Sequence, residues 1–321
     1  MACPGVVAPC PAHCRPPGSG RFAVRMPYRA AWKFLALLWG ATACARPEVS
    51  GSNAHIQAVD DAGDTVRLAT PAIRIVSLIP ATTELLFALG LGDHVVGRTT
   101  WCDYPREASR VPSLGDGLQP NLEAIVAVRP DLVVLYNSTQ NVAAADRLRA
   151  QHIPAILVAT DRLSDVPRLA RLLAVLGGNP AAGDSVAQAF ERDLAAATRA
   201  MPAAPASILI LAWDQPPIAI GAGSFLSELV ARAGARNLFD DLAAASAPVS
   251  LEAIASRDPD LILVVGDSLP AFSRRAEWQS LRAVHAGRFV RVPEALFSRP
   301  SPRSPAALVA LRTALESARQ P

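Results

Sequence analysis

Residues 121–135 read NLEAIVAVRPDLVVL, and residues 250–264 repeat the same pattern as SLEAIASRDPDLILV. In each copy a residue that favours helix N-caps, Asn121 or Ser250, precedes a Leu-Glu pair, as expected at the start of a short helix. A Pro-Asp pair then ends the helix, and the apolar run that follows is typical of a buried strand. The spacing of the copies is far too long for a solenoid repeat, so the sequence predicts two equivalent lobes.

Strand-like runs alternate with helix-like segments on both sides of these copies. A hairpin is expected over residues 58–68, where Asp and Gly turn residues separate two alternating segments. The Thr-Thr-Glu sequence at residues 82–84 is expected to cap a helix over residues 85–89 that stops at Gly90. The alternation predicts mainly parallel α/β sheets, with strands at residues 74–79, 95–97, 132–135, 155–158, 208–211 and 261–265.

The pattern becomes helical between residues 164 and 204. A leucine-rich helix is followed by Gly177-Gly178-Asn179-Pro180 and then by a long helical stretch over residues 181–199. The predicted organisation is an N-terminal lobe at residues 58–163, a helical connector at 164–204 and a C-terminal lobe at 205–321.

The N-terminus is typical of an export signal. Residues 1–43 are expected to be a leader, with the natural start at Met26. A cationic flank, Arg29 and Lys33, precedes an apolar run at residues 34–40 that is too short to span a bilayer permanently.

The end of this leader resembles a bacterial lipobox. Small residues at 41–43 lead directly to Cys44, which in a lipobox is acylated and becomes the lipid anchor. An ordinary secretory signal cleaved near Ala43 or Ala45 is the alternative. Residues 44–57 are then a tether, and the protein is expected in the periplasm or cell envelope, anchored to a membrane through lipid.

The mature part of the chain is not basic. Five basic residues and no acidic residue precede Cys44, and removing those five from the total of 31 leaves 26 basic against 28 acidic residues. No nucleic-acid partner is therefore expected. Cys102 is the only cysteine after Cys44, so an internal disulfide in the mature chain is excluded.

The sequence lacks the motifs that common classes of enzyme require. A dinucleotide enzyme needs a glycine-rich turn between the first strand and helix, but here that turn is residues 80–83, Pro-Ala-Thr-Thr. Gly90 and Gly92 follow the helix, where they cannot cradle a pyrophosphate. No nucleophile elbow, P-loop or pair of catalytic carboxylates is present, and we expect no enzymatic activity.

Four segments resemble a known family. Residues 74–84 (RIVSLIPATTE), residues 101–105 (WCDYP) and the two Leu-Glu repeats are similar to the helical-backbone periplasmic binding proteins of ABC importers for vitamin B12, haem and ferric siderophores. Residues 297–303 (FSRPSPR) look like the corresponding segment of the vitamin B12-binding members. The resemblance implies an α/β fold of two Rossmann-like lobes joined by a single long helix, with the ligand cleft between the lobes.

The resemblance also implies a function: a monomeric binding protein that delivers a corrinoid of the cobalamin type to an ABC permease dimer, with no cofactor of its own. Glu123 and Glu252 are then acidic knobs that engage arginines of the two permease subunits, one from each lobe. The competing interpretation is that each glutamate only complements the dipole of its helix.

Candidate ligand contacts combine aromatic faces with polar groups near strand ends. Rigid aromatic rings bury a broad corrin or porphyrin disc at little entropic cost, and an arginine can hydrogen-bond corrin amides or meet an acidic group. For two of the candidates the sequence leaves an alternative open: Trp213 can be a core residue, and Arg299 can be a solvated loop residue. The expected ligand contacts are Pro80, Ala81, Trp101, Tyr136, Trp213, Phe297 and Arg299.

Two positions depart from the vitamin B12-binding members. Gly117 and Ser246 stand six residues before the repeat glutamates, where the resemblance places tryptophans in those members. The pocket is therefore expected to be less aromatic, and a truncated or different corrinoid is an alternative ligand. Haem is the main rival ligand because Tyr136 or Tyr104 can serve as an axial ligand, and ferric siderophores are the second.

No metal site is expected. Cys102 is expected to be a small buried residue, with cobalt ligation as the alternative. His94, His152 and His285 have no partner at ligand spacing and are expected to be surface or loop residues.

Overall fold

The computed structural model describes residues 56–319. The predicted leader, Met26, Cys44 and most of the predicted tether lie outside the described residues. Residues 52–321 belong to one compact unit, and within it two sheets form the centres of two lobes.

The N-terminal lobe is a parallel sheet in the order β4-β3-β5-β6. The predicted hairpin is confirmed as an antiparallel pair, β1 (Ile56–Val59) and β2 (Thr65–Leu68). The sheet strands are β3 (Ile75–Ser77), β4 (Val95–Arg98), β5 (Leu132–Tyr136) and β6 (Ala155–Val158). The helices of this half are α1 (Pro80–Ala88), α2 (Leu122–Ala127), α3 (Thr139–Ala150) and α4 (Asp165–Leu176), with short 3-10 turns at Gly92–His94 and Arg106–Arg110.

The C-terminal lobe repeats this arrangement and adds two strands. Its parallel strands follow the order β9-β7-β11-β12, which is the same path as β4-β3-β5-β6, and β8 and β10 extend the sheet in antiparallel fashion. The strands are β7 (Ser207–Asp214), β8 (Pro217–Ile220), β9 (Arg236–Asn237), β10 (Ser246–Pro248), β11 (Leu261–Val265) and β12 (Phe289–Val292). The helices are α6 (Phe225–Arg232), α7 (Leu251–Arg257), α8 (Arg282–His285), α9 (Glu294–Phe297) and α10 (Ser304–Arg319), with 3-10 turns at Ala271–Arg274 and Trp278–Ser280.

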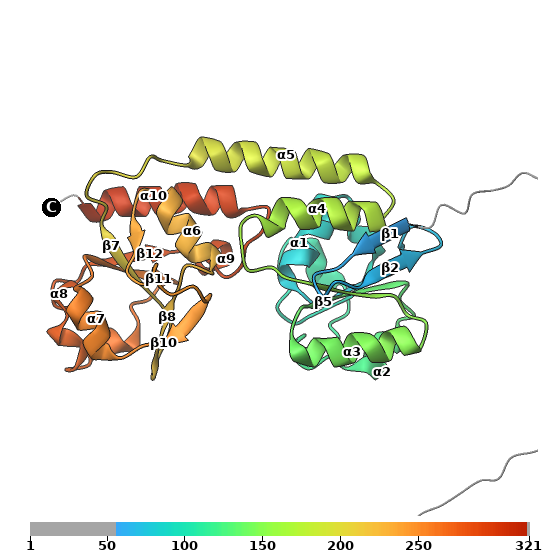
Figure 1. Cartoon of the computed structure of the whole chain (residues 1–321), viewed down its shortest axis with the longest axis horizontal. Coiled ribbons are helices and arrows are strands. Elements are labelled where there is room, and N and C mark those ends of the chain that lie inside the picture. Colours follow the sequence, from blue (N-terminus) through green and yellow to red (C-terminus); the bar gives the residue numbers. More distant parts are fainter. Residues whose placement is uncertain (1–55, 320–321) are drawn as a thin grey trace, which may run out of the picture. The chain divides into compact units, whose positions relative to one another are not determined.

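One long helix, α5 (Pro180–Ala197), joins the two halves (Figure 1). Its start is set by Asn179, whose side chain accepts a hydrogen bond from the Ala182 amide, and by Pro180 at the first position. The helix packs against α4 of the N-terminal half and α10 of the C-terminal half. Since α4 also packs on α1 and β1, α5 is the element that crosses between lobes; the exact lobe boundaries stay predictions.

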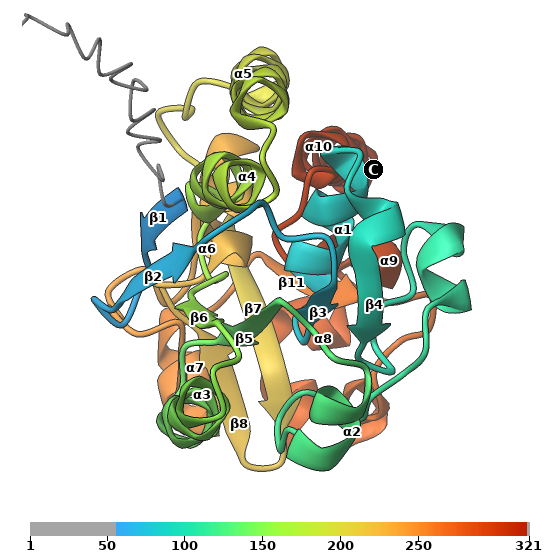
Figure 2. The same cartoon turned by 90° about the vertical axis from the view of Figure 1, so that its right-hand side faces the viewer.

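Helices cover both faces of the sheets (Figure 2). One buried apolar cluster runs through both lobes and includes residues of α4, α5 and α10. The opposite face of each sheet has its own smaller cluster, centred on Val133 and Leu148 in one lobe and on Leu209 and Trp278 in the other. The shared cluster makes α5 part of the core, and not a solvated linker.

The two repeat segments have matching local structure. The Asn121 side chain accepts a hydrogen bond of 3.1 Å from the Ala124 amide, and the Ser250 hydroxyl accepts one of 3.1 Å from the Ala253 amide. Both predicted caps are therefore confirmed. The residue before each Pro-Asp pair, Arg129 or Asp258, has a positive φ of 46° or 42°, which turns the chain out of the helix.

The aspartate of each Pro-Asp pair fixes the start of a central strand. The Asp131 carboxylate accepts hydrogen bonds of 2.9 Å from the amides of Ile73 and Arg74, just before β3. The Asp260 carboxylate accepts hydrogen bonds of 2.9 Å from the amide and hydroxyl of Ser207, the first residue of β7. The repeat thus aligns each lobe's central strand with its neighbour, a role that the sequence alone did not reveal.

The predicted Thr-Glu cap of the first helix is wrong. Helix α1 begins at Pro80, and its N-cap, Ile79, makes no side-chain capping bond, because an isoleucine side chain cannot accept one. Proline at the first helical position favours this start. Thr82 and Thr83 instead donate to the Ile79 carbonyl oxygen, at 2.9 and 3.1 Å. The predicted stop is confirmed, since Gly90 has a φ of 75° directly after the helix.

Removing either repeat cap should destabilise the fold modestly. Asn121→Ala and Ser250→Ala each leave a helix amide unpaired, and we expect each to lower the free energy of unfolding by about 1 kcal/mol. Urea denaturation of the two variants measures this. Gln140→Ala, at an exposed position within α3, is the control and should change the value by less than about 0.5 kcal/mol. Equal effects in all three variants would contradict the capping role.

None of the helices within residues 56–319 is both long and apolar enough to cross a membrane.

Candidate functional site

A cavity of about 770 Å³ lies between the two lobes. Part of its wall follows the carboxyl ends of the parallel strands β3, β4, β6 and β12, which is where open α/β sheets bind ligands. The N-terminal lobe contributes Ile79, Pro80, Ala81, Thr100, Trp101, Asp103, Thr160 and Asp161. The C-terminal lobe contributes Ser224, Phe225, Ala245, Glu294, Ala295, Ser298, Arg299 and Pro300. Four predicted contacts, Pro80, Ala81, Trp101 and Arg299, are among these residues.

Trp101 presents its ring to the cavity from the loop after β4. The side chain lines the cavity and the residue is 63% exposed. The next residue, Cys102, is buried, and its Sγ lies 3.1 Å from Thr83 Oγ1 and 3.2 Å from Thr99 Oγ1. This buried thiol fixes the loop, so the tryptophan beside it is held outward. Cys102 as a small buried residue is confirmed, and the cobalt-ligand alternative is wrong because the thiol does not reach the cavity.

Tyr136 is the last residue of β5. It does not line the cavity itself, but it contacts a residue that does. Its hydroxyl donates a hydrogen bond of 2.9 Å to the Asp161 carboxylate, and Asp161 lines the cavity. Burial, together with the hydrogen bond and charge of Asp161, raises the pKa of Tyr136 to about 12. The phenol therefore stays protonated at neutral pH. A direct contact of Tyr136 with ligand stays a prediction.

Two other predicted contacts lie away from the cavity lining. Trp213 is inside β7, is 59% exposed, and its indole N–H donates a hydrogen bond of 2.7 Å to the Gln215 carbonyl. Phe297 is 1% exposed and belongs to the shared core, so its prediction as a rim residue is wrong. Helix α9 turns Phe297 inward, while Glu294, Ala295 and Ser298 face the cavity.

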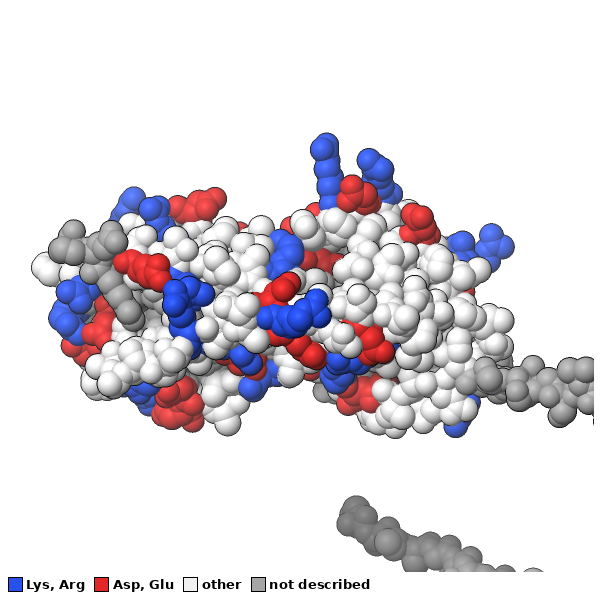
Figure 3. All heavy atoms as spheres, turned by 90° about the horizontal axis from the view of Figure 1, so that it is seen from above, with Lys and Arg blue, Asp and Glu red and all other residues white. Residues whose placement is uncertain are grey.

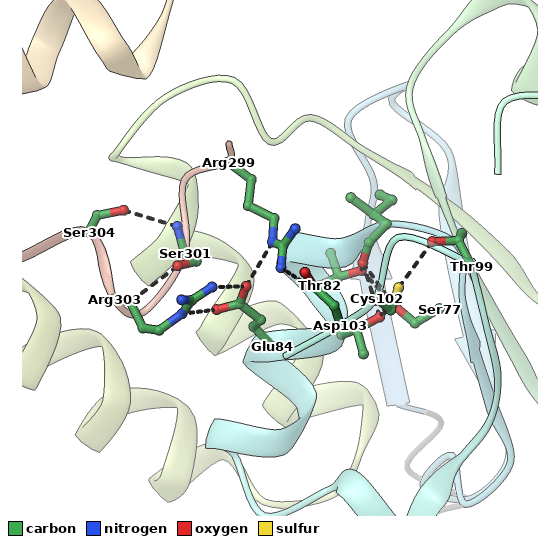
Figure 4. A network of polar contacts seen from close by, with 12 residues as sticks. Ser77, Thr82, Glu84, Thr99, Cys102, Asp103, Arg299, Ser301, Arg303 and Ser304 are labelled. Carbon is green, nitrogen blue, oxygen red and sulfur yellow. Dashed lines mark hydrogen bonds and ion pairs between the residues drawn. The ribbon is translucent and has the colours of Figure 1, made fainter. Parts of the chain in front are cut away.

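Arg299 connects the lobes through an ion-pair network (Figure 4). Its Nε donates to Glu84 Oε1 at 2.7 Å, and its Nη2 donates to Asp103 Oδ1. Glu84 belongs to α1 and Asp103 to the loop after β4, whereas Arg299 follows α9. Arg299 is thus neither a solvated loop residue nor an unpaired cation in the cleft.

Arg303, which directly precedes α10, completes this network. Its Nε and Nη2 donate to the two oxygens of Glu84 at 2.8 and 2.7 Å. Its guanidinium also stacks over the Tyr104 ring, 3.9 Å from the centroid. Hydrogen bonds of Ser301 with Ser304 and Arg303 hold the loop that carries both arginines. Tyr104 is therefore covered by an arginine, and it is not a cavity-lining residue.

The lining of the cavity is acidic. Asp103, Asp161 and Glu294 face one lining cation, Arg299, among the residues that the structure describes there. Burial raises the pKa of Asp103, but the hydrogen bond and charge of Arg299 outweigh it and hold the pKa below its usual value. The carboxylate is charged at neutral pH, and the cavity has a net negative lining.

Glu123 and Glu252 are both exposed, each in the first turn of its helix. Hydrogen bonds from its own backbone and from Ser250 lower the pKa of Glu252, so that it is ionised at neutral pH. Helices α2 and α7 both lie on the side of this unit away from α5 (Figures 1 and 2). The two helices that carry these exposed glutamates therefore lie on the same side of the unit.

Elsewhere the charges are mixed in sign. On the face that carries α5, arginines lie beside acidic side chains (Figure 3); Arg171, for example, pairs with Asp184 and Glu191, each at 3.2 Å. In the part of the chain that is described, no cluster of three or more His, Cys, Asp or Glu side chains is arranged to hold a metal ion.

The family model described as "Periplasmic binding protein" matches residues 75–296, which include the sheets of both lobes and all of the cavity lining except residues 298–300. The chain belongs to this family.

Curated relatives narrow the functional class. The vitamin B12-binding protein of Pectobacterium atrosepticum is 28% identical over 236 residues, covering 72% of this chain and 84% of the relative. The uncharacterised ABC transporter substrate-binding lipoprotein YvrC of Bacillus subtilis is 29% identical over 256 residues, covering 76% and 81%. These relatives are periplasmic or extracytoplasmic binding proteins. The chain is accordingly the substrate-binding protein of an ABC importer and not an enzyme.

Solved structures share the two-lobe fold. The haem-binding protein RhuT of Roseiflexus sp. RS-1 in apo form has a TM-score of 0.68 at 26% identity, covering 77% of this chain and 99% of that chain. The vitamin B12-binding protein BtuF of Vibrio cholerae has a TM-score of 0.66 at 24% identity, covering 78% and 99%. The predicted fold class is confirmed.

Proposed function

We propose that this binding protein captures a corrinoid of the cobalamin type in the cavity between its lobes and delivers it to the importer. The observation that carries the proposal is the acidic lining, in which the only lining cation described, Arg299, is already paired with carboxylates. The similarity to vitamin B12-binding proteins supports the same ligand class.

The charge of the cavity favours a ligand with neutral amides. Corrinoids carry carboxamide side chains, whose N–H groups can donate to Asp103, Asp161 and Glu294. Haem carries propionate carboxylates, and ferric siderophores are commonly anionic, so both meet like charges there. Like charges placed together in a binding site cost affinity and act against the wrong ligand.

The apolar part of the cavity suits a flat ring system. Trp101 offers an exposed aromatic face, and Pro80, Ala81 and Phe225 add apolar wall from both lobes. Such a combination of a few apolar surfaces with placed polar groups is typical of small-molecule sites. Aromatic contacts of this kind are worth about 0.5–1.5 kcal/mol beyond the area they bury.

Haem is the rival ligand, and the lining argues against it. Among the described residues that line the cavity, none is a histidine, tyrosine, methionine or cysteine, the side chains that ligate haem iron. Tyr136 lies nearby, but a pKa of about 12 disfavours the phenolate. Tyr104 is stacked under Arg303.

Delivery requires contact with the permease. We assign this contact to Glu123 and Glu252, because they are exposed carboxylates at equivalent positions of the two lobes and a permease of two subunits offers two equivalent contacts. The lipid anchor at Cys44 also belongs to this proposal. Mass spectrometry of the native N-terminus tests it: an acylated Cys44 supports the anchor, and an unmodified residue near Ala43 or Ala45 contradicts it.

The ligand assignment predicts a clear order of affinities. Titration calorimetry of the purified protein with cyanocobalamin and with hemin should show binding of one cobalamin, tighter than hemin by at least about tenfold, or 1.4 kcal/mol. Tighter binding of hemin would overturn the proposal.

A matched pair of tryptophan variants checks the location. Trp101 and Trp213 are both exposed, but only Trp101 lines the cavity. Trp101→Ala should weaken cobalamin binding by about tenfold or more, and Trp213→Ala should not. Weaker binding by Trp213→Ala together with unchanged binding by Trp101→Ala would mean that the ligand binds outside this cavity.

A further inference from the structure

Four charged side chains meet at the boundary between the lobes. Glu84 and Asp103 belong to the N-terminal lobe, and Arg299 and Arg303 to the C-terminal lobe (Figure 4). The cluster is electrically balanced, with two carboxylates and two guanidinium groups. Only Asp103 and Arg299 of these four line the ligand cavity.

Glu84 is the buried member of the cluster. Its side chain is 1% exposed and accepts three charged hydrogen bonds, one from Arg299 and two from Arg303. A buried carboxylate without these partners would be strongly unfavourable. Glu84 therefore holds Arg299 in one orientation, with Nη2 of the guanidinium turned toward Asp103.

Asp103 is the accessible member. Its side chain is 69% exposed, and it pairs with Arg299, whose side chain is 14% exposed. Together Glu84 and Asp103 take up the Nε and Nη2 donors of Arg299, which form one of the edges that a ligand carboxylate can bind in bidentate fashion.

We propose that Asp103 and Glu84 determine ligand specificity: they occupy and neutralise Arg299, and the cavity therefore rejects ligands that carry carboxylates. Asp103 acts at the cavity wall, and Glu84 is a positioning residue that acts through Arg299. The inference rests on the proposed function only in taking this cavity as the ligand site.

The physical reason is competition for one cation. An anionic group that enters the cavity meets Asp103, Asp161 and Glu294, and it must compete with Asp103 for the charge of Arg299. Replacing Asp103 by the isosteric asparagine removes one repelling charge and exchanges a charged hydrogen bond with Arg299 for a weaker, neutral one. The same arginine then becomes an attractive site for a carboxylate.

The test compares an anionic and a neutral-amide tetrapyrrole on the same variants. Wild type and Asp103→Asn are titrated with protoporphyrin IX, whose propionates are ionised, and with cyanocobalamin. We expect Asp103→Asn to raise the affinity for protoporphyrin relative to the affinity for cyanocobalamin by about tenfold or more. The affinity gained for protoporphyrin should fall steeply with added salt.

Asp93→Asn is the matched control, because Asp93 is exposed on the same lobe and outside the cavity lining. It removes the same net charge and should leave the ratio within about twofold. Glu84→Gln tests the positioning role: a selective gain for protoporphyrin supports it, whereas equal weakening of both ligands indicates only a structural role and contradicts it.

Three outcomes overturn the inference: an unchanged ratio in Asp103→Asn, an equal shift in Asp93→Asn, or no measurable binding of protoporphyrin to Asp103→Asn. The proposed function fails separately, if wild type does not bind cyanocobalamin. In that case a gain of protoporphyrin affinity in Asp103→Asn still supports the role of Asp103.

Discussion

Reversing the charge of Glu123 and Glu252 together, as Glu123→Arg and Glu252→Arg, is expected to abolish uptake through the importer. Both side chains are exposed at the start of equivalent helices, one in each lobe. If each pairs with arginines of a permease subunit, reversal places like charges at two contacts. Such juxtaposition costs several kcal/mol, which is about 100-fold or more in affinity.

Two measurements are needed, because a misfolded protein would also fail to transport. Uptake of radiolabelled cobalamin in cells that carry the cognate importer should fall to background. Titration of the purified variant should give an unchanged ligand affinity, since neither residue lines the cavity.

The chain offers a matched control for this pair. Glu107 and Glu277 are also exposed, one in each lobe, and Glu107→Arg with Glu277→Arg should leave uptake intact. Wild-type transport by the Glu123/Glu252 variant would mean that these glutamates only complement their helix dipoles.

Glu84→Ala is expected to destabilise the protein by about 3–5 kcal/mol, because it leaves two largely buried arginines without their shared partner. Arg299 and Arg303 have side chains only 14% and 17% exposed and converge on this carboxylate. Arg299 retains Asp103, but Arg303 retains only its contact with the Tyr104 ring. The lobes are therefore expected to separate more easily as well.

Chemical denaturation followed by far-ultraviolet circular dichroism measures this loss. Glu107→Ala removes an exposed glutamate of the same lobe and should change the free energy of unfolding by less than about 0.5 kcal/mol. A loss below about 1 kcal/mol in Glu84→Ala would show that the network contributes little to the fold.

The lobe architecture could be predicted because its signals are local. Asn121 and Ser250 cap their helices through amides three positions away, so the short-range pattern was sufficient. The long helix α5 was likewise marked by Asn179 and Pro180 at its start. Apolar runs such as Leu132–Tyr136 are buried on nearly every residue, which made the parallel strands recognisable.

The polar network could not be predicted because its partners are distant in sequence. Glu84 and Arg299 are 215 positions apart, and a Thr-Thr-Glu sequence near a helix start is locally indistinguishable from a cap. Phe297 was misplaced for a related reason. Its neighbours Ser298 and Arg299 do face or reach the cleft, but the short helix α9 turns the phenylalanine into the core.

The aromatic contacts were predicted only in part. Trp101 follows the end of its strand and does face the cavity. Trp213 was expected just beyond a strand, but β7 continues through it to Asp214. The acidic residues Asp103, Asp161 and Glu294 were missed, because no sequence spacing relates three separate segments that meet only in the folded protein.

A crystal structure of the protein grown with cyanocobalamin tests the central claim most directly. We expect one corrin in the cavity between the lobes, with a ring face against Trp101 and side-chain amides donating to Asp103, Asp161 or Glu294. A cavity that stays filled by solvent alone, or a corrin bound on an outer surface, would contradict the account.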